Sequence, residues 1–560
     1  MTQTQAWQRL YERARRRGDA GFCAALCQEM DASIEVAAPD LERIPKSGPV
    51  VVVANHPFGL LEGVLLGSLL PRCRPYVKFV VNSLLSRIPE ISDLTICVDP
   101  YGGPQAVRAN LAAMKSAQEW LRQGHMLVMF PAGEVATLDL KRAGISEKPW
   151  NSGVVRLSTR ANAPVVPLHL AGSNSPLFHL AGLVHARLRT LLLPHELLNK
   201  QSQRFLIRIG HPIAADRLES FESLQQAADY LRKRVLLLGN RPESPRRTVR
   251  RQPLAAAAGE VVLAREVSNL PPDHRLLTSG EYEVWLADAG EMANLLPEIG
   301  RLREVAFRAA GEGTGSPADL DAFDAHYKHL FLWHPETRSV AGAYRLGLTD
   351  EIFVRNGISG LYTGTLFRYN PAFFRTIGPA VELGRSFVAP DHQKSYSALL
   401  SLWKGIGRFL VRNPQYRHLF GPVSISNDYL PASRHLLVEF LSRHRRAQGI
   451  AQLVSPRHPF RKGWPHGFDL DGLVSSDPED LSAILADIQP DQKGVPVLLR
   501  QYLKLGGELL AFNLDRKFSN VLDGLVLVDL LRTELRMLER YLGKDGAALY
   551  RAWHNRNVAA

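Results

Sequence analysis

Residues 50–59 read VVVVANHPFG, and a glutamate follows at position 62. The valine run predicts a buried strand of an α/β sheet, which places His56 at the carboxyl end of that strand, where such sheets carry function. An imidazole is the side chain best suited to remove a proton from an alcohol near neutral pH, and a carboxylate can fix its tautomer. The stretch predicts His56 as a general base oriented by Glu62, although an ordinary turn after a strand is the alternative interpretation.

Two more apolar runs support a sheet with function at its strand ends. Residues 126–130 read MLVMF and lead into Pro131-Ala132-Gly133-Glu134, while residues 164–170 read PVVPLHL. A helical pattern occupies residues 105–123 between strands, as in an α/β sheet. The ends of the first two strands could meet in one cleft. A plain β-turn at residues 131–134 is the alternative.

These blocks resemble the glycerolipid-type lysophospholipid acyltransferases over roughly residues 45–215. The resembling residues are NHPxG at 55–59, FPxGE at 130–134 and VPL at 166–168. That family usually has an aspartate five residues after the histidine, where this chain has Leu61, and it reads Phe-Pro-Glu-Gly-Thr in the later block. The variant spacing, with the acid at Glu62, also occurs in hemolysin-like and aminolipid-forming members.

The resemblance implies substrate-binding roles around the predicted base. The implied residues are Asn55, Gly59, Phe130, Pro131, Gly133 and Glu134, with the loop from Phe130 to Glu134 lining the acyl or head-group site. Arg87 falls in a block expected to contact a polar head or a carrier phosphate. A solvated arginine at a helix end is the alternative for Arg87.

The length and composition predict two globular domains. A chain of 560 residues is too long for a single core, and 45% apolar with 22% charged residues are globular values. Residues 239–259 combine proline, small polar residues and clustered arginine without apolar periodicity, as an interdomain linker would. The predicted division is therefore residues 1–238, a basic linker at 239–259, and residues 260–560.

The second half predicts a mixed sheet with helices, that is, another α/β domain. Strands are expected at 283–287, 340–346, 381–388 and 419–426, and helices at 291–309 and 395–412. This order resembles the plan of a GNAT-like N-acetyltransferase domain. Residues 280–530 resemble the ornithine N-acyltransferase family, through AGAYRL at 341–346, VELGRS at 381–386, LWKGI at 402–406, KGVPVLLRQY at 493–502 and VLDGL at 521–525.

The Glu-x-x-Arg strand of this second half is shared with acyl-homoserine lactone synthases, which acylate an amine from acyl carrier protein. By this resemblance Glu382 assists deprotonation of an ammonium group, and Arg385 pairs with the carboxylate of the acceptor, ornithine or a related amino acid. The alternative is a structural ion pair between Glu382 and Arg385.

An acyl carrier protein thioester is the expected co-substrate, and no tightly bound cofactor is expected. Residues 391–395 read DHQKS, without the glycine run that would cradle a pyrophosphate. The net charge, 68 basic minus 55 acidic side chains or +13, favours acidic partners such as the carrier or an anionic lipid surface. No nucleic-acid motif is present, and the four cysteines lack zinc-site spacing, so neither nucleic acid nor a metal is expected.

The first residues predict a helix with one apolar face. Trp7, Leu10, Tyr11 and Ala14 recur at helical spacing opposite arginines, which suits a helix lying at a membrane interface or, alternatively, one packed on the domain core. No run of 18 apolar residues and no secretory signal is seen. The expected location is cytoplasmic, peripheral on the inner membrane.

Together the two halves resemble the bifunctional ornithine lipid synthases. The resemblance implies that the C-terminal domain transfers a 3-hydroxyacyl group from acyl carrier protein to the α-amine of ornithine. The N-terminal domain would then acylate the free 3-hydroxyl. The alternatives are a single-activity phosphatidic-acid-type acyltransferase with a regulatory C-terminal module, and a hemolysin-like membrane-binding protein.

Overall fold

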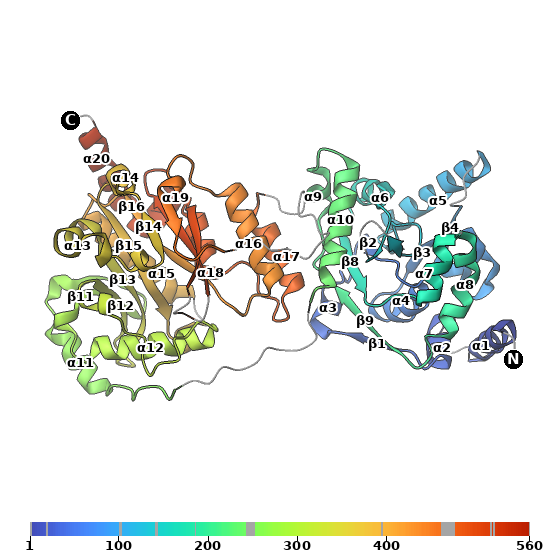
Figure 1. The fold of residues 1–560 in the computed structure, drawn as a ribbon, viewed down its shortest axis with the longest axis horizontal. Coiled ribbons are helices and arrows are strands. Elements are labelled where there is room, and N and C mark those ends of the chain that lie inside the picture. Colours follow the sequence, from blue (N-terminus) through green and yellow to red (C-terminus); the bar gives the residue numbers. More distant parts are fainter. Residues whose placement is uncertain are drawn as a thin grey trace. The chain divides into compact units, whose positions relative to one another are not determined.

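The computed structural model describes residues 3–17, 21–99, 104–139, 144–184, 186–241, 252–393, 396–460, 476–515, 518 and 521–558. The chain forms two compact units (Figure 1). Unit 1 contains residues 1–243 and, from much later in the sequence, Ser482–Gln492; unit 2 contains most of the remainder.

Unit 1 is an α/β unit. Its strands are β1 (Ser33–Val36), β2 (Val50–Ala54), β3 (Val77–Asn82), β4 (Thr95–Val98), β5 (Met126–Met129), β8 (Val165–Leu170) and β9 (Arg204–Ile209), with a separate pair, β6 (Thr137–Asp139) and β7 (Gly144–Ser146). The sheet order is β1-β9-β8-β2-β5-β3-β4, and every neighbouring pair is parallel except β8 and β9. All five residues of β2 are buried, as their apolar side chains dictate.

Helices flank this sheet. They are α1 (Gln3–Arg16), α2 (Phe22–Glu29), α3 (Ala38–Glu42), α4 (Leu60–Cys73), α5 (Pro104–Arg122), α6 (Gly153–Ala161), α7 (Pro176–Val184), α8 (Ala186–Leu198), α9 (Ala215–Glu219) and α10 (Leu224–Leu238), with the short turns η1 (Ser83–Arg87) and η2 (Pro89–Leu94). Leu10 and Ala14 of α1 are buried in the unit 1 core. The apolar face of α1 is therefore packed on the unit, which is the second of the two interpretations of this helix. None of the described helices has the length and hydropathy needed to span a bilayer.

Unit 2 is built on a mixed sheet of eight described strands. They are β10 (Arg275–Ser279), β11 (Tyr282–Asp288), β12 (Lys328–His334), β13 (Ser339–Leu348), β15 (Ala380–Val388), β16 (His418–Ile425), β18 (Glu508–Asp515) and β19 (Val521–Asp529), with a separate pair, β14 (Phe367–Tyr369) and β17 (Val454–Pro456). The order is β10-β11-β12-β13-β15-β16-β19-β18, and only β15 and β16 run parallel. Every strand predicted for this half matches an observed strand.

The helices of unit 2 cover this sheet. They are α11 (Glu260–Asn269), α12 (Leu295–Ala309), α13 (Thr349–Asn356), α14 (Pro371–Ile377), α15 (Tyr396–Arg412), α16 (Pro431–His444), α18 (Val497–Lys504), α19 (Leu535–Leu542) and α20 (Lys544–Val558). Helix α15 contacts β10, β11, β12 and β13. The predicted two-domain α/β architecture, with mixed sheets, is confirmed.

Residues 242–251 of the predicted linker lie outside the described residues, and one later segment belongs to unit 1 although the sequence-based division assigns it to residues 260–560. Residues 482–492, which include most of α17 (Pro478–Ile488), belong to unit 1. Asp487 of this segment is buried, and its carboxylate lies 2.7 Å from Arg234 and 3.1 Å from Arg43. The backbone N–H of His211 also donates to it. A segment more than 240 residues beyond the end of α10 thus supplies a charge to the interior of unit 1.

Candidate active sites

The turn after β2 is held in place by Asn55. Its side-chain amide donates to the Leu170 carbonyl at 2.9 Å, and its carbonyl oxygen accepts the Leu170 N–H at 2.7 Å. Asn55 thus satisfies both backbone groups at the end of the neighbouring strand β8. This fixes the point at which the chain leaves the sheet and places the next residue, His56, at the carboxyl edge. Asn55 therefore acts here through the backbone geometry of the turn.

His56 and Glu62 are paired, as the sequence predicts. The His56 Nδ1 atom lies 3.1 Å from Glu62 Oε1, and Glu62 is fully buried while His56 retains 17% side-chain exposure. The same Oε1 accepts the backbone N–H groups of Phe58 and Gly59. Because Glu62 lies in the first turn of α4, one carboxylate caps the helix and orients the imidazole. With Nδ1–H donating to Glu62, the Nε2 atom is the one that can accept a proton.

The charges of this pair stabilise each other. Burial lowers the pKa of His56, but the nearby Glu62 carboxylate outweighs it, and the net pKa is raised. Burial raises the pKa of Glu62, whereas the attraction of His56 and the backbone N–H donors lower it, and the net pKa is lowered. Glu62 therefore stabilises the protonated form of His56.

Gly59 is required at the tip of this turn. Its φ of 104° is one that residues with a side chain rarely adopt, and a Cβ atom there would lie 2.5 Å from Leu193 of α8. The tight turn brings α4 and its carboxylate back toward the imidazole. Gly59 therefore has a steric role in this turn, and its predicted substrate-binding role stays a prediction.

The Phe130 to Glu134 loop lies against the same histidine. The Phe130 ring stacks on the His56 ring with centroids 4.9 Å apart. Pro131 is buried, and its carbonyl accepts the Asn151 N–H; Gly133 has a φ of 66° and closes a turn back to Phe130. Glu134 is exposed and forms a 2.6 Å ion pair with Lys148. The two predicted strand ends do meet.

Glu147 is a residue at this site that the sequence did not reveal. One of its carboxylate oxygens accepts the backbone N–H of His56, and the other accepts the Trp150 indole N–H at 3.0 Å. The His56 carbonyl in turn accepts the Ala136 N–H at 2.9 Å. Burial raises the pKa of Glu147. Both backbone groups of His56 are thus fixed by the segment that follows the Phe130 loop.

Arg87 is not brought to this histidine by any contact within the described residues. It ends η1 and is exposed to solvent. Its predicted contact with a polar head or carrier phosphate stays a prediction.

In unit 2, Glu382 lies where β15 and β16 separate. Among the described residues these strands pair only from Ala380–His418 to Glu382–Phe420, although both continue further. Glu382 is only 1% exposed. Its carboxylate accepts hydrogen bonds from the Tyr327 hydroxyl at 2.6 Å and from the Thr363 N–H at 2.8 Å. Burial raises its pKa. Both oxygens are occupied, so Glu382 holds the adjacent turn, and its role as a proton acceptor stays a prediction.

Arg385 has other partners than Glu382. Its guanidinium lies 3.2 Å from Asp319 and 3.3 Å from Asp321, and it stacks over the Tyr362 ring at 4.7 Å. Burial lowers the pKa of Arg385, but the surrounding anionic groups raise it more. Its φ of 48° is uncommon for a residue with a side chain and is the kind of strain found at functional sites. The predicted acceptor-carboxylate contact stays a prediction.

Arg385 is part of a larger buried charge network. Arg345 is fully buried and lies 2.6 Å from Asp321 and 3.2 Å from Asp324, while Arg303 lies 3.2 Å from Asp324. Three arginines and three aspartates therefore balance one another. Such networks are costly to break, because each partner would leave an uncompensated charge.

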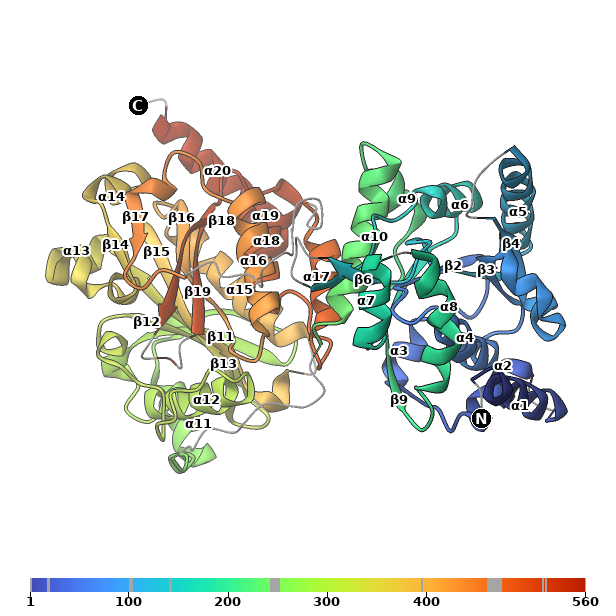
Figure 2. The same cartoon turned by 45° about the vertical axis from the view of Figure 1, so that its right-hand side comes forward.

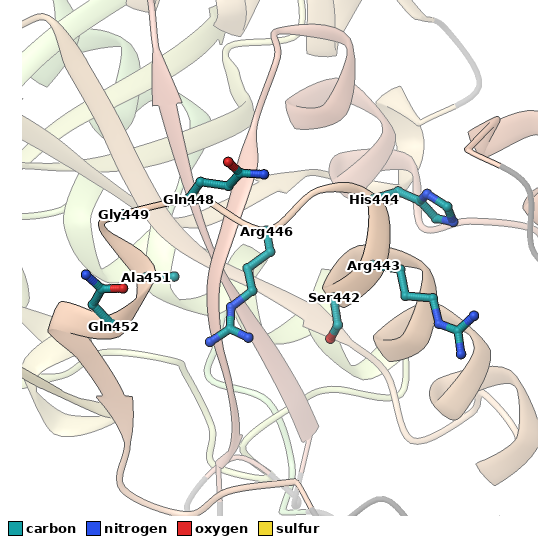
Figure 3. A pocket seen from close by; sticks show the side chains of 9 residues that line it. Ser442, Arg443, His444, Arg446, Gln448, Gly449, Ala451 and Gln452 are labelled. Atoms are coloured by element: carbon teal, nitrogen blue, oxygen red, sulfur yellow. The ribbon is translucent and has the colours of Figure 1, made fainter.

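Within the described residues no group of three or more histidine, cysteine or acidic side chains is placed to hold a metal ion. A surface pocket lies at the end of α16, lined by residues 442–452 including Arg446 and Gln448 (Figure 3). It contains none of the predicted site residues.

Two family models match the chain, one in each unit. Residues 24–244 match the family described as acyltransferase, and residues 302–404 match the acetyltransferase (GNAT) domain family. The first match covers β2, β5 and the His56 turn, and the second covers β15 with Glu382 and Arg385.

Two kinds of curated relatives each match part of the chain. A glycine N(alpha)-acyltransferase of Phocaeicola vulgatus is 31% identical over 254 residues, 42% of this chain and 76% of that protein. A lyso-glycine lipid O-acyltransferase of the same organism is 29% identical over 231 residues, 39% of this chain and 77% of that protein. The glycine N(alpha)-acyltransferase of Bacteroides thetaiotaomicron is 31% identical, and the match covers 79% of it.

Proposed function

The chain belongs to the family of N-acyltransferases that contains these glycine N(alpha)-acyltransferases, and we propose that it is a bifunctional enzyme of aminolipid synthesis. Unit 2 would transfer a 3-hydroxyacyl group to the α-amine of an amino acid and form an amide. Unit 1 would then acylate the 3-hydroxyl and form an ester. The pairing of two separate acyltransferase domains in one chain, each with relatives named for one of these two steps, carries the proposal.

For the ester step, His56 supplies the base. Its Nε2 atom takes the proton of the substrate hydroxyl, and the hydroxyl oxygen attacks the thioester carbonyl. The carbon–sulfur bond breaks, and the leaving thiolate takes the proton back from the imidazolium. Glu62 stabilises that imidazolium across 3.1 Å, and Glu147 holds the backbone of His56.

For the amide step, the acyl donor is expected to bind where β15 and β16 separate. Backbone groups that are no longer paired between these strands are available to the amides of a phosphopantetheine arm, as in strand addition to a sheet edge. Glu382 and the Arg385 network lie at the start of this separation. We propose acyl carrier protein as the donor for this step, supported by the net charge of +13, which suits an acidic partner.

The acceptor is an amino acid with a free α-amine. The motifs of unit 2 resemble ornithine N-acyltransferases, whereas the relatives named above are glycine N(alpha)-acyltransferases. Ornithine is therefore the first candidate and glycine the second. The two share the α-ammonium and carboxylate but differ in the side-chain ammonium of ornithine.

Unit 1 also offers an apolar surface to a lipid. Leu177 and Leu180 of α7 and Leu191 of α8 are each more than half exposed, and these helices pack together beside β6 (Figure 2). Leu193 of α8 lies against Gly59 in the catalytic turn. We propose that this surface rests on the inner membrane, so that the hydroxyl of a lyso-lipid reaches His56 from the bilayer.

An assay with purified full-length chain tests the proposed function. The chain is incubated with 3-hydroxyacyl carrier protein and either ornithine or glycine, and the products are identified by mass spectrometry. We expect a mono-acyl amide first and, with a second acyl thioester, an ester-amide. Formation of neither product, with acylation of 1-acylglycerol-3-phosphate instead, would favour a single-activity lysophospholipid acyltransferase with a regulatory unit 2. Membrane binding with no acyl transfer to any acceptor would favour the hemolysin-like alternative.

A further inference from the structure

Three polar side chains line up across neighbouring strands of unit 2. Ser424 of β16 is the register partner of Asp523 of β19, and Asp523 is the register partner of Asn513 of β18. Directly opposed residues point to the same face of a sheet. The Ser424 hydroxyl donates to Asp523 Oδ1 at 2.8 Å. The three side chains therefore form a polar row on one face of an otherwise apolar part of the sheet.

The side-chain amide of Asn513 has an N–H donor that is unpaired among the described residues. Asn513 is fully buried, and its carbonyl oxygen accepts the His458 N–H at 2.7 Å. Among the residues that the structure describes, its Nδ2 atom has no hydrogen-bond partner. Buried polar atoms are rarely left without a partner in native proteins, so this amide points to an acceptor oxygen that a ligand brings.

Carboxylates gather beside the same row. A Cβ atom on Gly311 would lie 2.2 Å from Asp428 Oδ2, so the backbone next to Glu312 rests on the Asp428 carboxylate. Burial and the charge of Asp523 raise the pKa of Glu312 to about 8, and burial raises the pKa of Asp523 to about 7. Asp515 also repels Asp523. The carboxyl groups are therefore held close together, and a cation bound among them would favour their charged forms.

Two cationic side chains of the protein act on this cluster, but they do not offset the burial and mutual repulsion of its carboxyl groups. Arg385 lowers the pKa of Asp523, and Lys493 lowers the pKa of Glu312, yet both carboxyl pKa values remain raised. Arg385 also reaches the Tyr362 hydroxyl at 3.4 Å, and that hydroxyl donates to Asp515 at 3.3 Å. The cluster is thus continuous with the Arg385 network of the candidate N-acyltransferase site.

The cluster is accessible from solvent. Asp428 and Lys493 are exposed, and Ser424 and Glu312 are half-buried. Asp523 and Asn513 are themselves buried, so a bound ligand would lie at the inner end of this partly exposed cluster. The combination of carboxylates with one unpaired amide donor matches an amino acid, which carries an ammonium group and a carboxylate.

We propose that Asp523 and Glu312 bind an ammonium group of the acceptor amino acid and that the Asn513 amide binds its carboxylate. This inference rests on the proposed N-acyltransferase function of unit 2 and names the residues that select its acceptor. The bound ammonium is the α-ammonium, shared by all acceptors, or the side-chain ammonium of a dibasic one. If the α-ammonium is bound, the cluster holds the reacting nitrogen. If the side-chain ammonium is bound, the cluster selects dibasic amino acids.

The test measures steady-state amide formation by the full chain with ornithine, glycine and norvaline, which lacks the side-chain ammonium. For Asp523→Asn and Glu312→Gln we expect the KM for the amino acid to rise about tenfold or more, because a charge-assisted contact is lost. The KM for the acyl donor and ester formation on supplied lyso-lipid stay within about twofold of the original chain. Asp529→Asn, on the same strand but paired with Arg417, is the matched control and keeps the KM for the amino acid.

The pattern across acceptors assigns the contact. A rise in KM for all three amino acids places the α-ammonium at the cluster. A rise in KM for ornithine alone places the side-chain ammonium there. Unchanged KM values for every amino acid, in variants that unfold at the original temperature, overturn the inference. If Asp523→Asn is too unstable to assay, Asn513→Ala and calorimetric titration with ornithine give the same decision. Failure of the unaltered chain to acylate any amino acid would instead remove the proposed function.

Discussion

The Nδ1 atom of His56 and the Oε1 atom of Glu62 lie 3.1 Å apart, and that oxygen also accepts the backbone N–H of Gly59. The start of α4 and the orientation of the imidazole therefore depend on one carboxylate. A change at Glu62 alters both the charge beside His56 and the cap of the helix. Glu62→Gln removes the charge but keeps a side-chain oxygen that can still cap the helix.

Glu62→Gln should lower the kcat of ester formation by at least about a hundredfold, because the imidazolium loses its stabilising charge. Glu62 raises the pKa of His56, so its removal lowers that pKa. His56 acts in its neutral form, and the acidic limb of the pH–rate profile should therefore move to lower pH. The profile of ester formation on a supplied lyso-lipid measures this shift. An unmoved acidic limb would contradict the assignment of His56 as the base.

Glu147→Ala should lower the kcat of ester formation by roughly ten- to a hundredfold with little change in KM, because it frees the backbone of His56 without touching the substrate. Trp150→Phe, which keeps the Glu147 contact with His56 but removes the indole donor, is the comparison and should lose less. A loss confined to KM would show that Glu147 contacts substrate instead.

Asp487→Ala should destabilise unit 1 by about 3–5 kcal/mol, because it leaves Arg43 and Arg234 buried without their carboxylate. Glu35→Ala removes only an exposed partner of Arg204 and should cost at most about 1 kcal/mol. Chemical unfolding followed by fluorescence compares the two. Equal stabilities would show that the segment 482–492 adds no stability to unit 1.

The buried Asp487 carboxylate also makes the stability of unit 1 depend on pH. Burial raises the pKa of Asp487, but Arg234 and His211 lower it more, and the net folded-state pKa lies below its ordinary value. A depressed folded-state pKa gives stability that is present above the unfolded pKa, about 4, and is lost as the pH falls through the folded value. Asp487→Ala should therefore flatten the acid side of the stability curve. A curve of unchanged shape would contradict this.

The sequence revealed the parts of the site that are close along the chain. His56 and Glu62 stand six residues apart across one strand-to-helix turn, and the valine run before them marks the strand. Glu147 lies 91 residues from His56, and Asp487 lies 253 residues from Arg234, so no local pattern could connect them. The elements were predictable because their periodicity is local, whereas the membership of residues 482–492 in unit 1 is set by long-range charge pairing.

The partners of Glu382 were hidden for the same reason. The Tyr327 hydroxyl comes from 55 residues upstream, and the Thr363 N–H belongs to a short 3-10 helix, η7 (Tyr362–Thr365). Neither has a spacing that predicts a contact with β15. The Glu-x-x-Arg spacing identified the strand but could not show that Glu382 and Arg385 have separate sets of partners.

Glu382→Gln should reduce amide formation at least about tenfold while ester formation on supplied lyso-lipid is retained. A neutral side chain weakens the contacts with Tyr327 and Thr363 that hold the turn at residues 362–365. Tyr327→Phe removes one of the same contacts and keeps the carboxylate. If Tyr327→Phe reduces the rate as much as Glu382→Gln, positioning explains the effect; if only Glu382→Gln does, the carboxylate itself takes the proton.

Replacing the exposed leucines of α7 and α8 should weaken membrane binding. The triple variant Leu177→Ser, Leu180→Ser, Leu191→Ser removes apolar area that the proposed bilayer contact would bury. Cosedimentation with anionic vesicles measures the loss, and amide formation from soluble substrates is the control. Full cosedimentation of the variant would place the lipid contact elsewhere.

The most direct test of two acyl transfers in one chain is the lipid content of a bacterial host that makes no aminolipids of its own. Mass spectrometry of cells that express the unaltered chain should show a diacylated aminolipid. Cells that express His56→Ala should accumulate the mono-acyl amide, because unit 2 still acts and unit 1 lacks its base. Diacylated aminolipid from His56→Ala, or no aminolipid from the unaltered chain, would contradict the account.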